Sequence, residues 1–270
     1  MKTRGWAITD VGRKRDHNED SFLCNDGLRL YAVADGMGGH LGGERASRMA
    51  VEILERELGR PPKEMEAGAA ADTQPRATGA PLHPVAMALR RATVLAAQAI
   101  HESAHTDEQL SGMGTTLTSV LFHGDHLTVC HVGDSRAYLY RDGRARQITE
   151  DHSWIQEQVR AGLVAPDDAL VSRFRNIITR SVGFEPTVEP DVVTLPIETG
   201  DCYLLCSDGL SNYLSADEIA RVLTAQFYAD AGQALVDIAN DRGGDDNVTC
   251  VVIYVANESQ GNASQRAPHV

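Results

Sequence analysis

Short apolar stretches separated by turn residues dominate the sequence and predict a protein rich in β-strands. Two pairs of these stretches are joined by very short connections, Gly124-Asp125 in one case and Arg141-Asp142-Gly143 in the other. Such connections are too short for a parallel crossover, so these neighbours are predicted to pair antiparallel. The predicted strands are 5–9, 28–34, 115–123, 126–132, 136–141, 144–149, 191–196, 201–207 and 248–255.

Helical periodicity lies between these groups of strands. In the longest helical segment, 84–108, apolar residues recur on one stripe that includes Leu89, Ala92, Ala96 and Ile100. The other predicted helices are 43–58, 151–161, 216–224 and 229–240. Groups of strands followed by groups of helices favour an α+β fold with antiparallel sheets over a doubly wound parallel sheet.

Two segments follow neither pattern. Residues 59–84 hold five of the ten prolines and are otherwise rich in Ala, Gly and Thr, so we expect a flexible surface insertion. Residues 257–270 are polar and aperiodic, so we expect a disordered tail. A chain of this length allows one domain of about 250 residues or two small ones.

The chain is acidic, with 25 Lys and Arg against 38 Asp and Glu and a formal net charge of −13 at pH 7. This charge repels nucleic acids and anionic membranes, and we find no local basic patch that would bind them. No apolar segment reaches membrane-spanning length, and the N-terminal segment lacks the apolar region of a signal peptide. The five scattered cysteines are typical of free thiols in a reducing cytosol, so we expect a cytoplasmic protein.

Acidic residues recur where the predicted strands begin or end. An Asp followed by Gly after a strand is common in an ordinary turn, so a single case carries little weight. Carboxylates at the ends of adjacent strands can converge, and a divalent cation relieves their mutual repulsion. Oxygen ligands suit Mg²⁺ or Mn²⁺ better than zinc, so we predict a dinuclear metal site. The residues concerned are Glu19, Asp20, Asp35, Asp134, Asp208, Asp245 and Asp246.

The motifs that contain these acidic residues resemble those of a known family. Segments 12–20, 34–40, 113–116, 132–136, 207–210 and 246–249 are similar to the motifs of bacterial PP2C-type (PPM) serine/threonine phosphatases. They occur in the family's order and spacing over roughly residues 5–255. Each motif alone is weak, but the ordered set is very specific.

The resemblance implies a fold and a chemistry. The fold is a four-layer αββα sandwich of two antiparallel sheets flanked by helices, and here it would occupy residues 1–256. The activity is hydrolysis of phosphoserine and phosphothreonine in proteins with Mn²⁺ or Mg²⁺, two ions to a site, through a hydroxide that bridges them. By motif position, Asp35 would bridge the two metals and the Gly36 carbonyl would bind one. Asp208 and Asp246 would bind the other, and Arg15 would bind the phosphate of the substrate.

The resemblance assigns further residues to the same site. Glu19 and Asp20 would contribute to metal binding directly or through water, and Asp134 would help Asp208 to hold a third, weaker ion. Animal members carry a histidine two positions after the bridging aspartate, proposed as the general acid, and this chain does not. The nearest histidine, His40, is one candidate for that acid, and a metal-bound water is the other.

The resemblance also implies a setting for the enzyme. Residues 151–183 match the variable flap beside the site. The partners would be phosphorylated proteins, including a cognate Ser/Thr kinase and its substrates, with no nucleic acid and no membrane span. We expect a monomer.

Two other classes of function compete with this interpretation. His101, Glu102 and His105 fit the H-E-x-x-H pattern of zinc peptidases on a predicted helix, but the third ligand of that pattern is missing. A catalytically inactive, phosphatase-like binding module is the second alternative. Such a module would be expected to lack one or more of the metal carboxylates, and this chain keeps them all.

Overall fold

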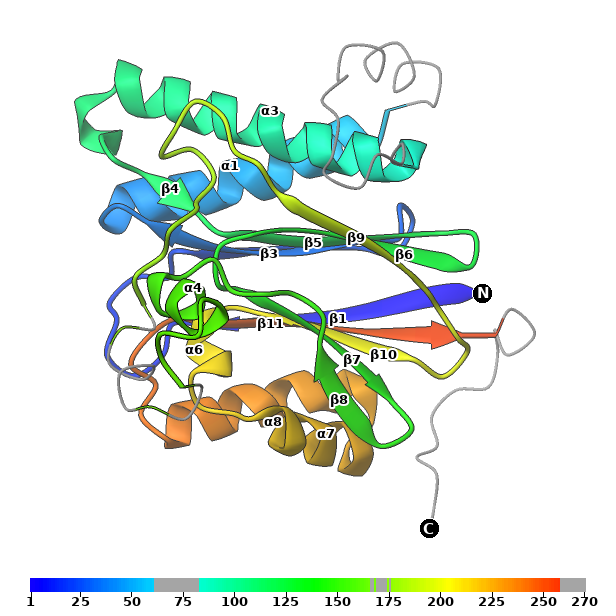
Figure 1. Cartoon of the computed structure of the whole chain (residues 1–270). Helices are drawn as coiled ribbons and strands as arrows, with labels where there is room; N and C mark the ends of the chain where they lie inside the picture. The colour runs from blue at the N-terminus through cyan, green and yellow to red at the C-terminus, as the bar shows by residue number, and fades with distance from the viewer. Residues whose placement is uncertain (61–82, 166–167, 169–173, 175, 258–270) are drawn as a thin grey trace.

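The computed structural model describes residues 1–60, 83–165, 168, 174 and 176–257, and they form four layers (Figure 1). Helices α1 (His40–Leu58) and α3 (Pro84–Thr106) cover one sheet. Helices α7 (Ala216–Ala225) and α8 (Tyr228–Asp241) cover the other. The predicted αββα sandwich is therefore confirmed. Most of the predicted insertion, 61–82, and of the predicted tail, 258–270, lies outside the described residues.

All the paired strands run antiparallel to their neighbours in the described part of the chain. One sheet has the order β2 (Asp20–Asn25), β3 (Leu30–Met37), β5 (Leu117–His123), β6 (His126–Val132) and β9 (Asp191–Pro196), with β4 (Gly114–Thr115) beside β3. The other has the order β1 (Lys2–Asp10), β11 (Val248–Ala256), β10 (Cys202–Cys206), β7 (Arg136–Arg141) and β8 (Arg144–Gln147). The two predicted hairpins, β5–β6 and β7–β8, are both present.

Several boundaries differ from the sequence-based predictions. Helix α1 begins at His40 rather than at residue 43. Gly42 and Gly43 are poor helix formers, so the sequence predicts a later start, but tertiary packing holds both glycines in the helix. Helix α4 (Trp154–Arg160) begins later than the predicted 151, because the Ser153 hydroxyl accepts the Gln156 amide and caps the helix.

Four short elements were missed. Strand β2 mixes polar and apolar residues and so lacks a clear apolar run. The predicted helix 84–108 ends at Thr106, because Asp107 is extended and starts a separate 3₁₀ helix. The missed elements are β2, β4, this 3₁₀ helix η1 (Glu108–Leu110) and the one-turn helix α6 (Asp208–Ser211).

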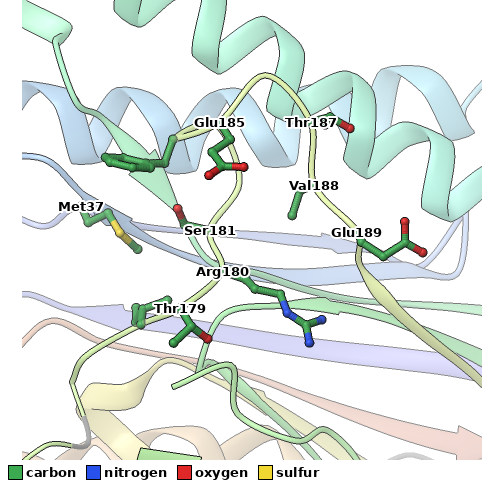
Figure 2. Close-up of a pocket in the computed structure, with 10 residues that line it drawn as sticks. Met37, Thr179, Arg180, Ser181, Glu185, Thr187, Val188 and Glu189 are labelled. Atoms are coloured by element: carbon green, nitrogen blue, oxygen red, sulfur yellow. The ribbon is translucent and has the colours of Figure 1, made fainter. Parts of the chain in front are cut away.

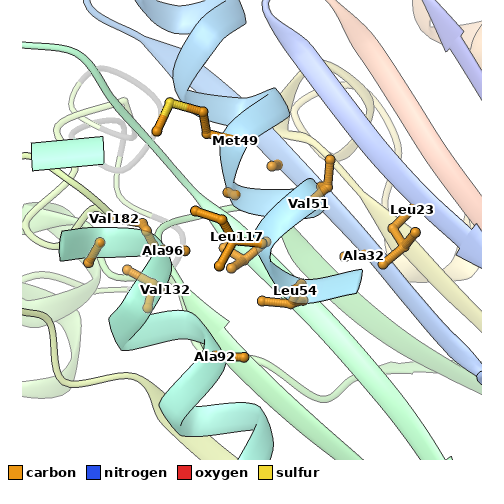
Figure 3. Close-up of a cluster of buried hydrophobic side chains, with 14 of the residues drawn as sticks. Leu23, Ala32, Met49, Val51, Leu54, Ala92, Ala96, Leu117, Val132 and Val182 are labelled. Atoms are coloured by element: carbon orange, nitrogen blue, oxygen red, sulfur yellow. The ribbon is translucent and has the colours of Figure 1, made fainter. Parts of the chain in front are cut away.

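The core lies in three layers, one between the sheets and one under each pair of helices. Central strands are buried on both faces: in β11, Val252 packs toward α7 and α8, and Val251 packs toward the other sheet. This explains why these strands read as apolar runs without alternation. Figure 3 shows the layer under α1 and α3, where Leu54 and Leu117 are completely buried. The buried residues fix the sheets so that the ends of their strands form a defined edge.

Two expectations from composition are met within the described residues. All five cysteines are free thiols, and four of them are buried. Of the helices described, none combines the length and the apolar character that crossing a membrane requires.

Candidate metal centre

The first group of acidic residues lies at one corner of the sheet that α1 covers. Asp20 begins β2 and sits directly opposite Asp35 in β3. Strand β3 continues to Met37, beyond the predicted end at residue 34, because β4 pairs with its last residues. Asp35 is therefore held within a strand rather than in a turn. Glu19 is joined to the same corner, because its carbonyl accepts a hydrogen bond from the Gly36 amide at 3.2 Å.

The second group comes from the other sheet. Asp208 follows β10 as the first residue of α6, and Asp246 lies two residues before β11 begins. Strands β10 and β11 are paired, so the two carboxylates lie at one edge. The Ser207 hydroxyl donates to Asp20 Oδ2 at 2.8 Å, which connects this edge to the first group. Both groups thus face each other at the end of the sandwich that carries β4 and α6, on the left in Figure 1.

Asn247 holds the loop before β2 in place. Its side-chain amide donates to the carbonyls of Val11 and His17, at 2.9 Å each. Its Oδ1 accepts the Glu19 amide at 2.8 Å. Asn247 therefore positions the segment that carries Arg15 and Glu19. The sequence alone assigns Asn247 no role, although its place beside Asp246 in a matching motif is a usable signal.

Two glycines allow α1 to approach this corner closely. A Cβ atom on Gly43 would lie 2.0 Å from Glu19 Oε2, and one on Gly36 would lie 2.1 Å from the Gly43 carbonyl oxygen. Any side chain at either position would displace the Glu19 carboxylate or the helix. The glycines therefore bring the first turn of α1 into contact with the acidic corner.

Crowding of the carboxylates changes their acidity. Burial, and to a smaller extent the carboxylates of Asp208 and Asp246, raise the pKa of Asp20 to about 7. The pKa of Asp35 is raised well above its usual value, by burial first and then by Asp20. The pKa of Asp134 rises to about 8 through burial and the charge of Asp208. The environment of Asp20, Asp35 and Asp134 therefore favours neutral carboxyl groups or a compensating cation.

Asp134 lies in the turn after β6 and is buried. The adjacent Gly133 amide donates to His152 Nδ1 at 3.1 Å, and the His152 amide donates to the Gly133 carbonyl oxygen at 2.7 Å. Next to this turn, Arg136 forms a two-pronged ion pair with Asp151, with its shortest contact at 2.7 Å. The start of the predicted flap, 151–183, is thus attached to the loop that carries Asp134.

Arg15 lies at the rim of the acidic cluster. Its Nη2 donates to Asp246 Oδ2 at 2.8 Å, and half of its side chain is exposed. Asp245, the neighbouring acidic residue, instead pairs with Lys14 on the outer surface. His40 is the first residue of α1, but its side chain lies outside the described part of the structure.

The chain matches the protein phosphatase 2C family over residues 12–250. It belongs to that family. A relative in Listeria monocytogenes, named serine/threonine phosphatase stp, is 35% identical over 249 residues, which are 91% of this chain and 93% of the relative. Protein phosphatase PhpP of Streptococcus pneumoniae is 36% identical over 93% of this chain and 97% of its own.

A third relative is larger. Serine/threonine protein phosphatase PstP of Mycobacterium tuberculosis is 38% identical over 94% of this chain, and the match spans 45% of that protein. Its crystal structure superposes with a TM-score of 0.81 at 36% identity, covering 95% of this chain and 100% of the solved one. A structure of its catalytic domain in complex with two manganese ions superposes with a TM-score of 0.76 at 36% identity, covering 95% of this chain and 99% of the solved one.

These relatives establish the class of this phosphatase. It is a metal-dependent protein serine/threonine phosphatase of the 2C type, and the alternatives of a zinc peptidase and an inactive binding module are not favoured. His101 and His105 make other contacts: the ring of His105 hydrogen-bonds to the His101 carbonyl at 2.9 Å, and the ring of His101 to the Phe184 carbonyl at 3.2 Å. Glu102 is exposed on the same helix.

The residues of this phosphatase fit divalent cations by their chemistry. All the side chains gathered at the edge offer carboxylate oxygen, which Mg²⁺ and Mn²⁺ prefer. Asp20 Oδ1 is buried and finds no hydrogen-bond partner among the described residues, so an uncompensated polar atom lies within the cluster. Among those same residues, no three acidic, His or Cys side chains already have the arrangement of a metal centre. The fit therefore rests on donor type and burial, and not on preset ligand distances.

Proposed function

We propose that this chain hydrolyses phosphoserine and phosphothreonine in proteins at the acidic edge between its two sheets. The observation that supports this most directly is the convergence of Asp20, Asp35, Asp208 and Asp246 from two different sheets on one partly buried edge. Burial and the neighbouring carboxylates raise the pKa of Asp20 and Asp35, so keeping these two groups ionised costs stability unless a cation is bound. A site of this kind serves a reaction on a highly charged substrate such as a phosphate monoester.

Two divalent cations, Mn²⁺ or Mg²⁺, are proposed to bind here. Asp35 and the Gly36 carbonyl would hold one or both ions, Asp208 and Asp246 would hold the second, and Glu19 and Asp20 would bind directly or through water. A third ion would use Asp134 together with Asp208. When bound, such cations neutralise phosphoryl oxygens and lower the pKa of water so that it attacks at neutral pH.

Arg15 is proposed to bind the phosphoryl group. It is half exposed at the rim and, among the described residues, forms a hydrogen bond only with Asp246, so most donors of its planar guanidinium can reach a substrate. Two parallel hydrogen bonds from such a fork match two phosphoryl oxygens. They would orient the group for in-line displacement and stabilise the charge that builds up during the reaction.

The leaving serine or threonine oxygen needs a proton, and His40 is proposed as its donor. His40 begins α1, five residues after Asp35, and histidine is the residue type most often used as a general acid. A water on one of the cations is the alternative donor. His40→Asn should flatten the alkaline side of the kcat–pH profile if His40 is the acid, and it should leave the profile unchanged if water is.

The decisive experiment is hydrolysis of p-nitrophenyl phosphate and a phosphothreonine peptide, with EDTA and with added Mn²⁺. Asp208→Ala is the test variant, and Asp217→Ala, which removes an exposed carboxylate from α7, is the matched control. We expect activity that requires Mn²⁺, a loss of about 100-fold or more in kcat for Asp208→Ala, and no loss for Asp217→Ala. Metal-independent turnover, or full activity in folded Asp208→Ala, would contradict the proposal.

The setting of the enzyme is part of the same proposal. Residues 1–256 would form one phosphatase domain, with 151–183 as its flap, and the chain would act as a monomer on phosphoproteins that include a Ser/Thr kinase. Five free thiols favour the cytoplasm as its compartment. An autophosphorylated bacterial Ser/Thr kinase that keeps its phosphate in the presence of active enzyme and Mn²⁺ would contradict the pairing.

A further inference from the structure

A cavity of about 470 Å³ opens beside the acidic edge. Its walls come from Met37 at the end of β3 and from the segment between α4 and β9, as Figure 2 shows. Apolar walls are formed by Met37, Ile178, Phe184 and Val188, and charged groups come from Arg180, Glu185 and Glu189. The proposed metal ligands and Arg15 do not line this cavity.

The outer wall of the cavity is fixed to the fold. Val182 and Thr115 exchange two main-chain hydrogen bonds, of 2.8 and 3.0 Å, so this segment continues the sheet beyond β4. Gly183 has a φ of +98°, and a Cβ there would lie 2.1 Å from Ile100 Cγ2, so the backbone packs directly on α3. The cavity is therefore preformed by residues that the sheet and α3 hold in place.

The cavity lies within reach of a bound substrate chain. Met37 is two residues beyond Asp35 in the same strand, which places them about 7 Å apart. An extended peptide advances by the same distance in two residues. A substrate whose phosphoresidue is at the acidic edge would therefore bring a side chain about two positions away to the cavity mouth.

The charges around the cavity favour one kind of side chain. Arg180 is paired with Asp191 at 3.0 Å, and Glu189 is paired with Arg90 at 3.0 Å. Glu185 forms no hydrogen bond or ion pair with any residue that the structure describes, so its carboxylate remains available. The charges of these two ion pairs largely cancel, so the carboxylate of Glu185 leaves one negative charge at the cavity.

The residue before Glu185 contributes an exposed aromatic ring to the same cavity lining. Phe184 is 66% exposed and lines the cavity, so its ring is accessible to a bound ligand. A ring and a carboxylate side by side suit a cation on a long aliphatic stem, because the stem packs on apolar walls and the charge meets the carboxylate and the ring face.

We propose that this cavity binds a lysine or arginine side chain of the protein substrate, two residues from the phosphoserine or phosphothreonine. The proposal rests on the proposed function and adds a sequence preference to it. Glu185 would provide the charge, and Phe184, Met37 and Val188 would provide the apolar contacts. The acidic net charge of the chain, −13, would support the same preference at longer range.

The test uses phosphothreonine peptides that differ only two residues before or after the phosphothreonine, where they carry Arg, Ala or Glu. The full chain with Mn²⁺ should show a kcat/KM about fivefold higher for Arg than for Ala at one of these positions. In Glu185→Lys the ratio of kcat/KM for the Arg peptide to that for the Glu peptide should fall below one. Glu52→Lys makes the same charge change on the exposed face of α1 and should keep the wild-type ratio.

Each result separates the two proposals. Equal kcat/KM for Arg and Ala at both positions, a preference for Glu, or an unchanged ratio in Glu185→Lys would overturn the cavity proposal while leaving the phosphatase activity intact. A preference for Glu would instead indicate that Arg180 exchanges Asp191 for the substrate. Failure of the wild type to hydrolyse p-nitrophenyl phosphate with Mn²⁺ would overturn the proposed function itself.

Discussion

Removing divalent metal should make the stability of this phosphatase fall as pH rises, and Asp20 allows the size of the effect to be worked out. Folding buries this carboxyl group among other carboxylates and raises its pKa from 3.8 to about 7. A raised pKa means that the folded state binds the proton more tightly than the unfolded state. The resulting stabilisation is complete below pH 4 and is lost as the pH rises through 7.

The magnitude follows from the two pKa values. One pKa unit corresponds to about 1.4 kcal/mol, so the whole effect of Asp20 is about 4 kcal/mol. About 2 kcal/mol of this disappears between pH 5.5 and pH 8, because pH 5.5 lies about 1.5 units below the folded-state pKa. For a chain of this size that is a fall in Tm of about 4–8 °C.

The assay is thermal unfolding of EDTA-treated protein at pH 5.5 and pH 8, with Asp20→Asn as the comparison. Asparagine keeps the shape and can still accept the hydrogen bond from Ser207, but it does not titrate. The wild type should lose about 4–8 °C more than the variant over this range. Saturating Mn²⁺ should raise the wild-type Tm more at pH 8 than at pH 5.5, because a cation competes with the proton. Identical pH dependence in both proteins would refute the reasoning.

Three further predictions test other parts of the structure. Gly43→Ala should lower kcat by about 100-fold in a p-nitrophenyl phosphate assay, because the new Cβ would displace the Glu19 carboxylate. An unchanged kcat would show that α1 moves away and leaves Glu19 in place. Burial and a neighbouring histidine lower the pKa of His131 from 6.5 to about 3. The contribution of neutral His131 to the free energy of unfolding is present above pH 6.5 and should fall by about 2 kcal/mol from pH 7 to pH 5. Urea unfolding of the Mn²⁺-loaded protein measures this fall, and His131→Gln should not show it. Arg141→Met should destabilise the fold by about 3–5 kcal/mol, since it removes the cation that pairs with the Asp201 carboxylate, which is 1% exposed and would keep only neutral donors, the Glu198 amide and the Tyr203 hydroxyl. The kcat of the surviving folded protein should not change.

The sequence determined most of the architecture. Strands such as β10 and β11 are buried on both faces, so their apolar character is continuous and easily recognised. Strand β2 was missed because its apolar residues are only three in a row, Phe22–Cys24, between polar residues, and its pairing with β3 supplies the order that its own sequence lacks. The four residues of α6 are likewise too few to give a helical period.

The candidate site also has features that the sequence predicts and features that only the tertiary structure shows. Each acidic residue could be picked out because it stands at the end of a strand or in a motif, and this is local information. That Asp20 meets Ser207, 187 residues away, depends on how the two sheets stack, as does the role of Asn247 in holding the loop of Arg15 and Glu19. No spacing along the chain encodes such contacts.

The sequence by itself therefore determined the class of the fold and the family to which the chain belongs, and it supplied the acidic residues that we propose as cation ligands. Strand burial and the order of motifs can both be read along the chain. Only the tertiary structure decided which carboxylates share one environment and how far their pKa values rise, because burial and charge repulsion depend on distances in space. It also decided that the segment ending at β9 encloses a cavity next to Met37. The sequence matched part of this segment to the family's flap but not its shape, which depends on contacts with Thr115 and Ile100.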